Sequence, residues 1–225
     1  SSDVCSSDLQ SYMKTIVVKE GSRDIINEAF RVLRSNMDFM AGKDKGQNVF
    51  VLTSFNPGSG KSFLTMNIAM SFAIKKKRIL VIDGDLRHGS VSSYVDSPRI
   101  GLSDYLGNRV ENWKEIIVAD KKYDNLHILP IGTVPPNPTE LLEDGKLATL
   151  IGALRGEYDY IFIDCPPIDI VADAQIIEKL ADRTIFVVRS GLLDRGMLPE
   201  LENIYQEKRF RNLSVILNGT ESARS

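Results

Sequence analysis

Cysteine and long apolar runs are scarce in this sequence of 225 residues, and positive charge is not in excess. The two cysteines, Cys5 and Cys165, cannot build a disulfide framework, so the composition favours a reducing compartment. The longest apolar runs, such as 49–52 and 79–82, are the length of strands and fall far short of the ~20 residues of a membrane span. Lysine and arginine number 28 against 30 aspartates and glutamates, which gives a net charge of −2 and a pI near 5.8. No nucleic-acid partner is therefore expected.

The composition is otherwise that of an ordinary globular protein, with 43% hydrophobic and 26% charged residues. The length corresponds to one large domain or two small ones, and it is sufficient to bury a core. The first residues show no periodicity and no signal-peptide pattern. We expect residues 1–22 to be an artefactual or disordered segment, residues 23–219 to form the folded domain, and residues 220–225 to be a truncated tail.

Short apolar segments alternate with helical patterns along the chain. Strands are predicted over 48–53, 78–83, 126–129, 159–164, 183–189 and 213–217, and helices over 23–40, 61–74, 172–180 and 199–208. A further helix is predicted to start at Thr139, whose hydroxyl would cap it. Strands that are apolar on both faces and alternate with helices predict an α/β fold, with a mostly parallel sheet flanked by helices on both faces. Ligands of such folds bind beyond the carboxyl ends of the strands.

The segment 54–62, SFNPGSGKS, follows the first predicted strand and opens a helix. Gly58 and Gly60 would let the backbone fold around a phosphate with its N–H groups pointing inward, at the positive end of the helix dipole. Lys61 would reach the outer phosphates, and the Ser62 hydroxyl would be a ligand of Mg²⁺. The motif therefore predicts a nucleotide-binding loop.

One position departs from the usual GxxxxGK[ST] pattern, because Phe55 stands where the first glycine is expected. The alternative for this segment is an ordinary glycine-rich turn between a strand and a helix. The flanking strand and helix favour phosphate binding over that alternative. The residues predicted to bind the nucleotide here are Pro57, Gly58, Ser59, Gly60, Lys61, Ser62 and Phe63.

Acidic residues end two other predicted strands, with Asp83 and Asp85 after one and Asp164 after the other. Carboxylates at such ends would lie beside the phosphates and would hold Mg²⁺ directly or through water. Asp83 and Asp85 are two residues apart, so an extended chain would turn them to the same side. The alternative is that these residues only cap helices or begin turns. Arg87 would either neutralise phosphate charge or pair with an acidic neighbour.

Together these motifs resemble the bacterial tyrosine kinases of capsular and exopolysaccharide biosynthesis, which are relatives of the MinD/ParA P-loop ATPases. The pattern Glu28-x-x-Arg31-x-x-Arg34 resembles the subunit-contact motif of that family, and its residues share one helix face. Without the resemblance, a solvated charged face would be the simpler interpretation of this pattern. The segment 135–142, PPNPTELL, resembles another family motif. Asn218 is expected, by the same resemblance, to contact adenine through its amide.

The resemblance spans residues 23–219 and implies a P-loop tyrosine kinase domain that uses ATP and Mg²⁺. It implies that the catalytic residues are Lys61, Asp83 and Asp85. It implies that the metal ligands are Ser62, Asp85 and Asp164, and that Arg87 and Asn218 complete the nucleotide site. Asp83 is the candidate for accepting the proton of the tyrosine hydroxyl, although the spacing also allows Asp83 and Asp85 to exchange roles.

The resemblance further implies a ring-like homo-oligomer whose subunits phosphorylate one another on a C-terminal tyrosine cluster. All seven tyrosines of this sequence precede Asn218, so that cluster is missing from it. Implied partners are a membrane polysaccharide co-polymerase that sets chain length, fused or separate, and a cognate tyrosine phosphatase. The implied location is the cytoplasmic face of the bacterial inner membrane, with this fragment itself soluble.

Two other functions are compatible with the same motifs. The first is a MinD/ParA-like ATPase switch without tyrosine kinase activity, which would need ATP-dependent dimerisation but no tyrosine acceptor. The second is a non-catalytic assembly module, in which the helix that carries Glu28 would make the main contacts and ATP would only order the ring. The absence of an early lysine from the phosphate loop favours the kinases over the partitioning ATPases.

Overall fold

The computed structural model describes residues 15–41, 46–168 and 172–220. The strands are β1 (Val49–Thr53), β2 (Ile79–Asp83), β3 (Val118–Ala119), β4 (Leu126–Leu129), β5 (Tyr160–Asp164), β6 (Arg183–Arg189) and β7 (Ser214–Asn218). The α-helices are α2 (Ile25–Ala41), α3 (Lys61–Ala73), α4 (Leu102–Leu106), α5 (Pro138–Glu143), α6 (Lys146–Leu154), α7 (Asp173–Glu178) and α8 (Leu198–Gln206). Three 3₁₀ turns complete the described elements, namely η1 (Ser92–Val95), η2 (Trp113–Ile116) and η3 (Arg195–Met197).

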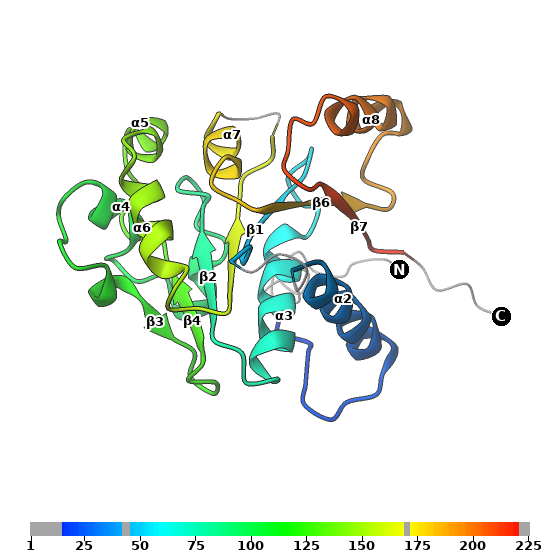
Figure 1. The fold of residues 1–225 in the computed structure, drawn as a ribbon, viewed down its shortest axis with the longest axis horizontal. Coiled ribbons are helices and arrows are strands. Elements are labelled where there is room, and N and C mark those ends of the chain that lie inside the picture. The colour runs from blue at the N-terminus through cyan, green and yellow to red at the C-terminus, as the bar shows by residue number, and fades with distance from the viewer. Residues whose placement is uncertain (1–14, 42–45, 169–171, 221–225) are drawn as a thin grey trace, which may run out of the picture.

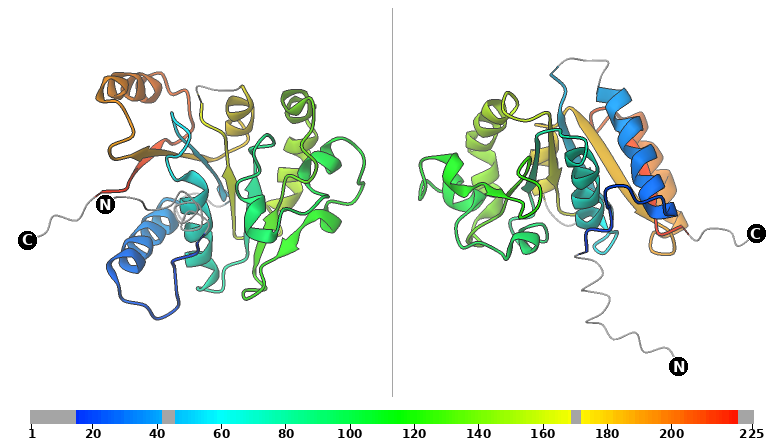
Figure 2. Two further views of the ribbon diagram at one scale, coloured as in Figure 1. Left: turned by 180° about the vertical axis from the view of Figure 1, so that it is seen from behind. Right: turned by 90° about the horizontal axis from the view of Figure 1, so that it is seen from below.

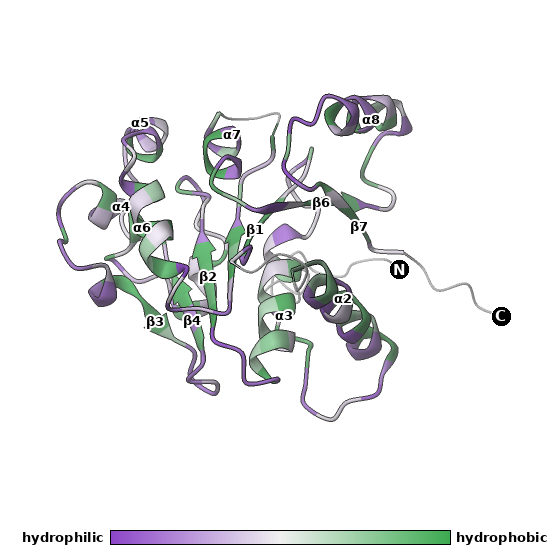
Figure 3. Cartoon of the chain, viewed as in Figure 1, coloured by the Kyte–Doolittle hydropathy of each residue, from purple (hydrophilic) through white to green (hydrophobic). Residues whose placement is uncertain are grey.

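The strands form one seven-stranded sheet in the order β3-β4-β2-β5-β1-β6-β7, and every pair is parallel except β3 with β4 (Figure 1). Helices α2 and α3 pack on one face, and helices α4 to α8 lie over the other (Figure 2). Hydrophobic residues are concentrated in the strands, whereas the helices also carry hydrophilic ones (Figure 3). This arrangement confirms the predicted fold class. Among the described helices, none has both the length and the apolar character needed to cross a bilayer.

The central strands bring the candidate motifs together at the carboxyl-terminal ends of the strands. Strands β1, β2 and β5 are buried along their whole length, as expected for parallel strands covered on both faces. Strand β5 lies between β1 and β2, and its last residue, Asp164, pairs in register with Leu52 and with Asp83. The loop after β1 and the acidic ends of β2 and β5 are therefore neighbours.

The predicted elements lie within two residues of the observed ones, with one correction at α5. Thr139 does not cap this helix, because α5 begins at Pro138 and Asn137 occupies the cap position. Proline suits the first helical position, where its missing N–H would have no partner. The Thr139 hydroxyl instead donates to Asp173 Oδ1 at 2.6 Å. Helices α4 and α6 and the short strand β3 were not predicted.

Residues 15–22 pack against the domain, on the N-terminal side of its predicted start at residue 23. The backbone N–H groups of Val17 and Val18 donate to Asn67 Oδ1 at 2.8 and 3.2 Å. Val18 is buried in the core formed with α2 and α3. The predictions for residues 1–14 and 221–225 fall outside the described residues.

Replacing Asn67 by alanine tests how far this N-terminal segment stabilises the domain. Asn67 is fully buried, and its amide also donates to Phe63 O at 2.9 Å and Thr15 O at 3.3 Å. We expect Asn67→Ala to lower the free energy of unfolding by about 2 kcal/mol, because buried backbone groups lose their partners. Urea denaturation measures this change. The matched control is Asn36→Ala at an exposed position of α2, and equal losses in the two variants would contradict the expectation.

Candidate active site

The loop between β1 and α3 has the backbone conformation that a phosphate cradle requires. Gly58 and Gly60 have φ values of +75° and +88°, which favour glycine over any residue with a Cβ. At Gly60 an added Cβ would also lie 2.4 Å from Asn218 Nδ2. The hydroxyl of Ser59 donates to Asn56 O at 2.7 Å and holds the turn. The exposed Pro57 and Gly58 form the tip of the loop, directly before the N-terminus of α3.

Phe55 is a core residue, which explains why the loop tolerates it in place of the expected glycine. Its side chain is 3% exposed, and its ring packs edge-on against Phe186 with centroids 4.7 Å apart. Phe55 belongs to the cluster that joins β6 to α7 and α8. The bulk at this position therefore anchors the loop to the core.

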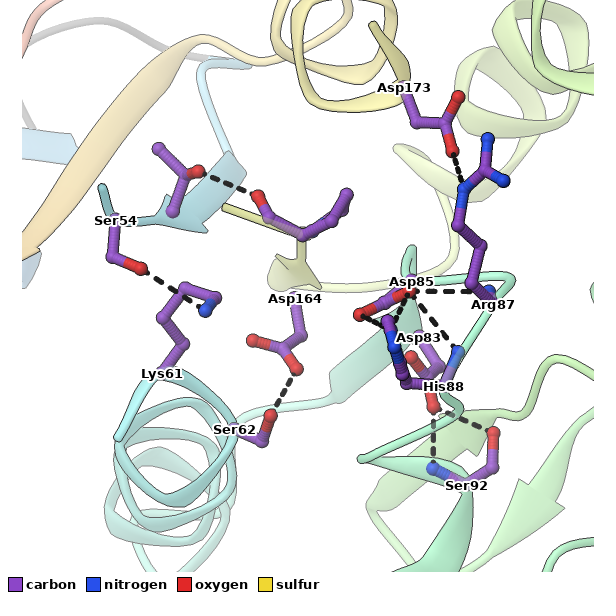
Figure 4. A network of polar contacts seen from close by, with 12 residues as sticks. Ser54, Lys61, Ser62, Asp83, Asp85, Arg87, His88, Ser92, Asp164 and Asp173 are labelled. Carbon is purple, nitrogen blue, oxygen red and sulfur yellow. Dashed lines mark hydrogen bonds and ion pairs between the residues drawn. The ribbon is translucent and has the colours of Figure 1, made fainter. Parts of the chain in front are cut away.

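Lys61 begins α3, and its ammonium group is buried at the site. Its Nζ donates to Ser54 Oγ at 3.2 Å (Figure 4). Burial lowers the pKa of Lys61, and the nearby carboxylates of Asp164 and Asp85 oppose that shift. A desolvated cation of this kind, held between acidic groups at a helix N-terminus, is suited to bind phosphate oxygens.

Asp164 connects the end of β5 to the start of α3. Its Oδ2 accepts a hydrogen bond from Ser62 Oγ at 2.5 Å, and Thr65 Oγ1 lies 3.4 Å from its other oxygen. Burial raises the pKa of Asp164 to about 6, and the positive charge of Lys61 limits the rise. The structure thus places the two predicted metal ligands Ser62 and Asp164 in direct contact with each other.

Asp83 is completely buried at the end of β2. Its Oδ2 accepts two hydrogen bonds from Ser92, one from the backbone N and one from Oγ, both at 2.7 Å. Its Oδ1 has no hydrogen-bond partner among the described residues. Burial is the main cause that raises the pKa of Asp83 to about 8, and the negative charges of Asp164 and Asp85 add to it.

Asp85 lies beyond the end of β2 and has different partners. Its Oδ1 accepts hydrogen bonds from the backbone N–H groups of Arg87 and His88, both at 3.2 Å. The ring Nδ1 of His88 lies 3.0 Å from Oδ2 of the same carboxylate. Asp85 is 8% exposed, whereas Asp83 is fully enclosed, so the two aspartates differ in their access to solvent.

These groups fit a phosphate-bound Mg²⁺. The carboxylates of Asp164 and Asp85 act on the buried Lys61, and Asp83 is close enough to both to be repelled by them. A divalent cation would relieve the repulsion among the three carboxylates. Ser62, Asp85 and Asp164 offer oxygen ligands, which Mg²⁺ prefers. In the described part of the chain, no group of three or more His, Cys, Asp or Glu side chains forms a complete metal site. That is expected for Mg²⁺, which usually takes one or two carboxylates together with substrate phosphates.

Of the two contacts expected for Arg87, with phosphate or with an acidic neighbour, the structure shows the one with an acidic neighbour. Its Nε donates to Asp173 Oδ2 at 3.1 Å, and its Nη2 donates to Thr139 Oγ1 at 3.3 Å. Asp173 is buried at the start of α7, so this ion pair compensates a buried carboxylate. Figure 4 shows the guanidinium directed toward Asp173. The role predicted for Arg87 in nucleotide binding stays a prediction.

Two residues at the ends of the outer strands β6 and β7 donate hydrogen bonds to backbone oxygens of the phosphate loop. Asn218, at the end of β7, donates from Nδ2 to Ser59 O at 2.9 Å. Arg189, at the end of β6, donates from Nη1 to Gly58 O at 2.8 Å. Arg189 was not predicted, although its place at the carboxyl end of a strand was a usable signal. Phe63, also predicted at the site, is half-buried on α3 and contacts Phe30.

The three predicted contact residues of α2 are engaged within the chain. Arg31 pairs with Glu28 and donates to Ser22 O, and Arg34 donates to Ser71 O at 2.9 Å. A separate apolar stripe on the same helix is exposed, with Ile25, Val32 and Phe39 exposed to 78%, 60% and 67%. A spacing of seven residues places these three side chains on one face.

A profile of the AAA domain family matches residues 47–209. The tyrosine-protein kinase YwqD of Bacillus subtilis is 30% identical over 207 residues, which cover 92% of this chain and 86% of that protein. The tyrosine-protein kinase CpsD of Streptococcus agalactiae is 32% identical over 193 residues, which cover 85% of this chain and 81% of the relative.

Solved structures give the same result. The chimerical protein CapA2B2 superposes with a TM-score of 0.82 at 30% identity, covering 92% of this chain and 90% of that one. The kinase domain of the Escherichia coli tyrosine kinase ETK has a TM-score of 0.77 at 30% identity, covering 88% and 78%. MinD of Pyrococcus horikoshii, complexed with Mg-ADP, has a lower TM-score of 0.63 at 25% identity, covering 76% and 69%. The chain therefore belongs to the family of bacterial tyrosine-protein kinases, which share the P-loop fold of MinD.

Proposed function

We propose that this chain transfers the γ-phosphoryl group of ATP to tyrosine hydroxyls and so regulates the synthesis and export of capsular or exopolysaccharide. The observation that carries the proposal is the hydrogen bond from Ser62 Oγ to Asp164 Oδ2 at 2.5 Å. Ser62 is the residue that follows Lys61 in the phosphate loop. The hydrogen bond joins the loop that would hold phosphate to the strand end that would hold a metal. Membership of the kinase family favours tyrosine transfer over a MinD/ParA-like ATPase switch.

Binding of ATP uses the loop between β1 and α3. The N–H groups of the loop and of the first turn of α3 surround the phosphates, and Lys61 contacts the β- and γ-phosphate oxygens. Ser62, Asp85 and Asp164 would hold Mg²⁺, directly or through water. When bound, Mg²⁺ would supply positive charge that offsets the negative charge of the phosphates and the carboxylates. Asn218 is proposed to contact the adenine, and its hydrogen bond to Ser59 O, which keeps it beside the loop, supports this role.

Transfer forms a bond between the tyrosine oxygen and the γ-phosphorus, while the bond to the β,γ-bridging oxygen breaks and ADP keeps that electron pair. Asp83 accepts the proton of the tyrosine at Oδ1, the oxygen without a protein partner among the described residues. Its pKa of about 8 without a cation would fall as positive charge enters, since repulsion from Asp164 and Asp85 contributes to the rise. The two hydrogen bonds from Ser92 fix the direction of the Asp83 carboxylate and leave Oδ1 as its acceptor. Because Asp83 is fully enclosed, this role also requires the tyrosine hydroxyl to displace the groups that cover Oδ1.

Self-association through α2 is part of the proposal. The stripe of Ile25, Val32 and Phe39 supplies apolar area, and the ion pair of Glu28 with Arg31 adds charge on the same helix. Arg34 faces α3, where it donates to Ser71 O. Exposed apolar stripes of this kind are typical of interaction surfaces. A ring would let one subunit present tyrosines to the site of its neighbour. The proposed partners are a membrane polysaccharide co-polymerase and a tyrosine phosphatase, at the cytoplasmic face of the inner membrane.

Replacing Lys61 by methionine tests the activity. We expect Lys61→Met to lower the rate of phosphotyrosine formation at least about 100-fold, because the cation that stabilises the transferring phosphoryl group is lost. The measurement uses γ-labelled ATP, Mg²⁺ and a tyrosine-rich peptide, with the labelled sites mapped by mass spectrometry. The matched control is Lys75→Met at an exposed position after α3. ATP hydrolysis without any phosphotyrosine would contradict the kinase and support the ATPase switch.

The buried carboxylate of Asp83 predicts a pH dependence of stability in the absence of divalent cations. Between about pH 4 and 8 the folded chain keeps a proton on Asp83 that the unfolded chain has released, so the free energy of unfolding falls as pH rises. The asparagine of Asp83→Asn cannot ionise, so the free energy of unfolding of this variant should lack the part of the pH-dependent decrease that Asp83 causes. The difference between wild type and variant, measured by urea unfolding at several pH values, should grow toward pH 8. Parallel curves would contradict the raised pKa.

A charge placed on the apolar stripe tests the oligomer. We expect Val32→Asp and Phe39→Asp to be monomeric in light scattering with ATP and Mg²⁺ under conditions where the wild type associates, because a charge is costly to bury in a contact. The control is Tyr205→Asp, at a 58% exposed position of α8. Association that survives both α2 substitutions would exclude this face.

A further inference from the structure

Within the described residues, Ser92 makes both of the hydrogen bonds that reach the Asp83 carboxylate. It lies in η1, nine residues after Asp83, and is 2% exposed. Its backbone N and its Oγ both donate to Asp83 Oδ2 at 2.7 Å. Figure 4 shows both contacts on the side of Asp83 away from Lys61. One oxygen of the carboxylate is thus occupied, and the other, Oδ1, is left without a partner among the described residues.

The Ser92 hydroxyl is itself fixed in direction. The backbone N of Ile131 donates to Ser92 Oγ at 2.8 Å, so this oxygen accepts one bond while its single hydrogen points to Asp83. Ile131 is the second residue of the proline-rich segment after β4, and it is buried. The segment that contains it is anchored in turn, since Leu102 N donates to Pro130 O at 2.8 Å.

The turn that leads to Ser92 is built for this approach. Gly89 has φ +62°, and an added Cβ there would lie 2.8 Å from Ile131 Cδ1 and 3.6 Å from Ser92 Cβ. A residue with a Cβ would be strained at this positive φ and would crowd the tip of the Ile131 side chain. The positive φ of Gly89 is independent of the hydrogen bonds, and it favours glycine in the turn that leads to η1.

We infer that Ser92 is a positioning residue for phosphoryl transfer, which holds the Asp83 carboxylate so that Oδ1 alone receives the tyrosine proton. The inference rests on the proposed function, because it needs Asp83 to act as the base. A carboxylate held by one hydrogen bond can turn its acceptor oxygen away from the reacting hydroxyl, and small misplacements of a catalytic group are costly in rate. The two bonds from one residue prevent that rotation.

Steady-state kinetics of Ser92→Ala, in the full chain, test the inference. The substitution removes the hydroxyl and leaves the backbone donor in place. We expect kcat for phosphotyrosine formation to fall about 10-fold, while KM for ATP and the affinity for Mg²⁺ with a non-hydrolysable ATP analogue change less than about twofold. The matched control is Ser93→Ala, whose hydroxyl donates to Ser90 O at 2.7 Å and makes no contact with Asp83.

A double-substitution cycle shows whether Ser92 acts through Asp83. If it does, Ser92→Ala should slow the wild type but cause no further loss in a chain that already carries Asp83→Asn. Additive losses would overturn the inference, and so would a fall in nucleotide affinity that matches the fall in kcat. Ser92→Cys keeps the size and a weak donor, so its rate should lie between those of the wild type and Ser92→Ala. It replaces the alanine variant if the latter melts well below the wild type.

ATP hydrolysis separates a failure of this inference from a failure of the proposed function. If the wild type labels no tyrosine, the proposed function fails, and the same variants are compared by their rates of hydrolysis. The attacking water then takes the place of the tyrosine hydroxyl before Asp83. A loss on Ser92→Ala that disappears in the Asp83→Asn background would support the positioning role in either reaction. Unchanged hydrolysis would overturn it.

Discussion

Strand β5 lies between β1 and β2, and this order of strands determines what the site contains. Asp164 ends β5, pairs in register with Asp83 of β2, and faces the start of α3 that follows β1. Its contact with Ser62 joins the phosphate loop to the acidic edge of the sheet. Because all three strands are parallel, their carboxyl ends meet at one place, as is usual for ligand sites in such folds. The functional residues come from different segments, and only the sheet brings them together.

This concentration of charge works against the stability of the fold. Burial raises the pKa of both Asp83 and Asp164, and it lowers that of Lys61. Perturbations of this size are typical of functional sites, where the environment suits a ligand. The surrounding structure compensates through apolar anchors, of which Phe55 is the clearest. Its ring packs against Phe186 and holds the loop to the core where the motif usually has a glycine.

Much of the fold could be predicted from local patterns, since the buried strands are short apolar runs that end in polar motifs. The elements and contacts that these patterns did not predict have physical explanations. Helix α4 has five residues, and α6 follows a helix that breaks at Gly145 with φ +82°, so neither has a long periodic pattern. Thr139 has the side chain of a helix cap, yet its hydroxyl is taken by Asp173, a residue distant in sequence. Local preference did not decide that position.

We could identify the phosphate loop, the acidic ends of two buried strands and the kinase family from the order of residues alone, because each rests on short motifs whose chemistry depends on neighbouring residues. The partners that orient those motifs were decided by tertiary structure. Arg87 pairs with Asp173 on α7, Arg189 donates to Gly58, and Ser92 holds Asp83. The spacing of residues in the chain does not predict such contacts, since they depend on the order of the strands and on the paths of the loops between them. The surroundings of Asp83 and Asp85 differ for the same reason, because burial and hydrogen-bond partners depend on tertiary structure and not on spacing.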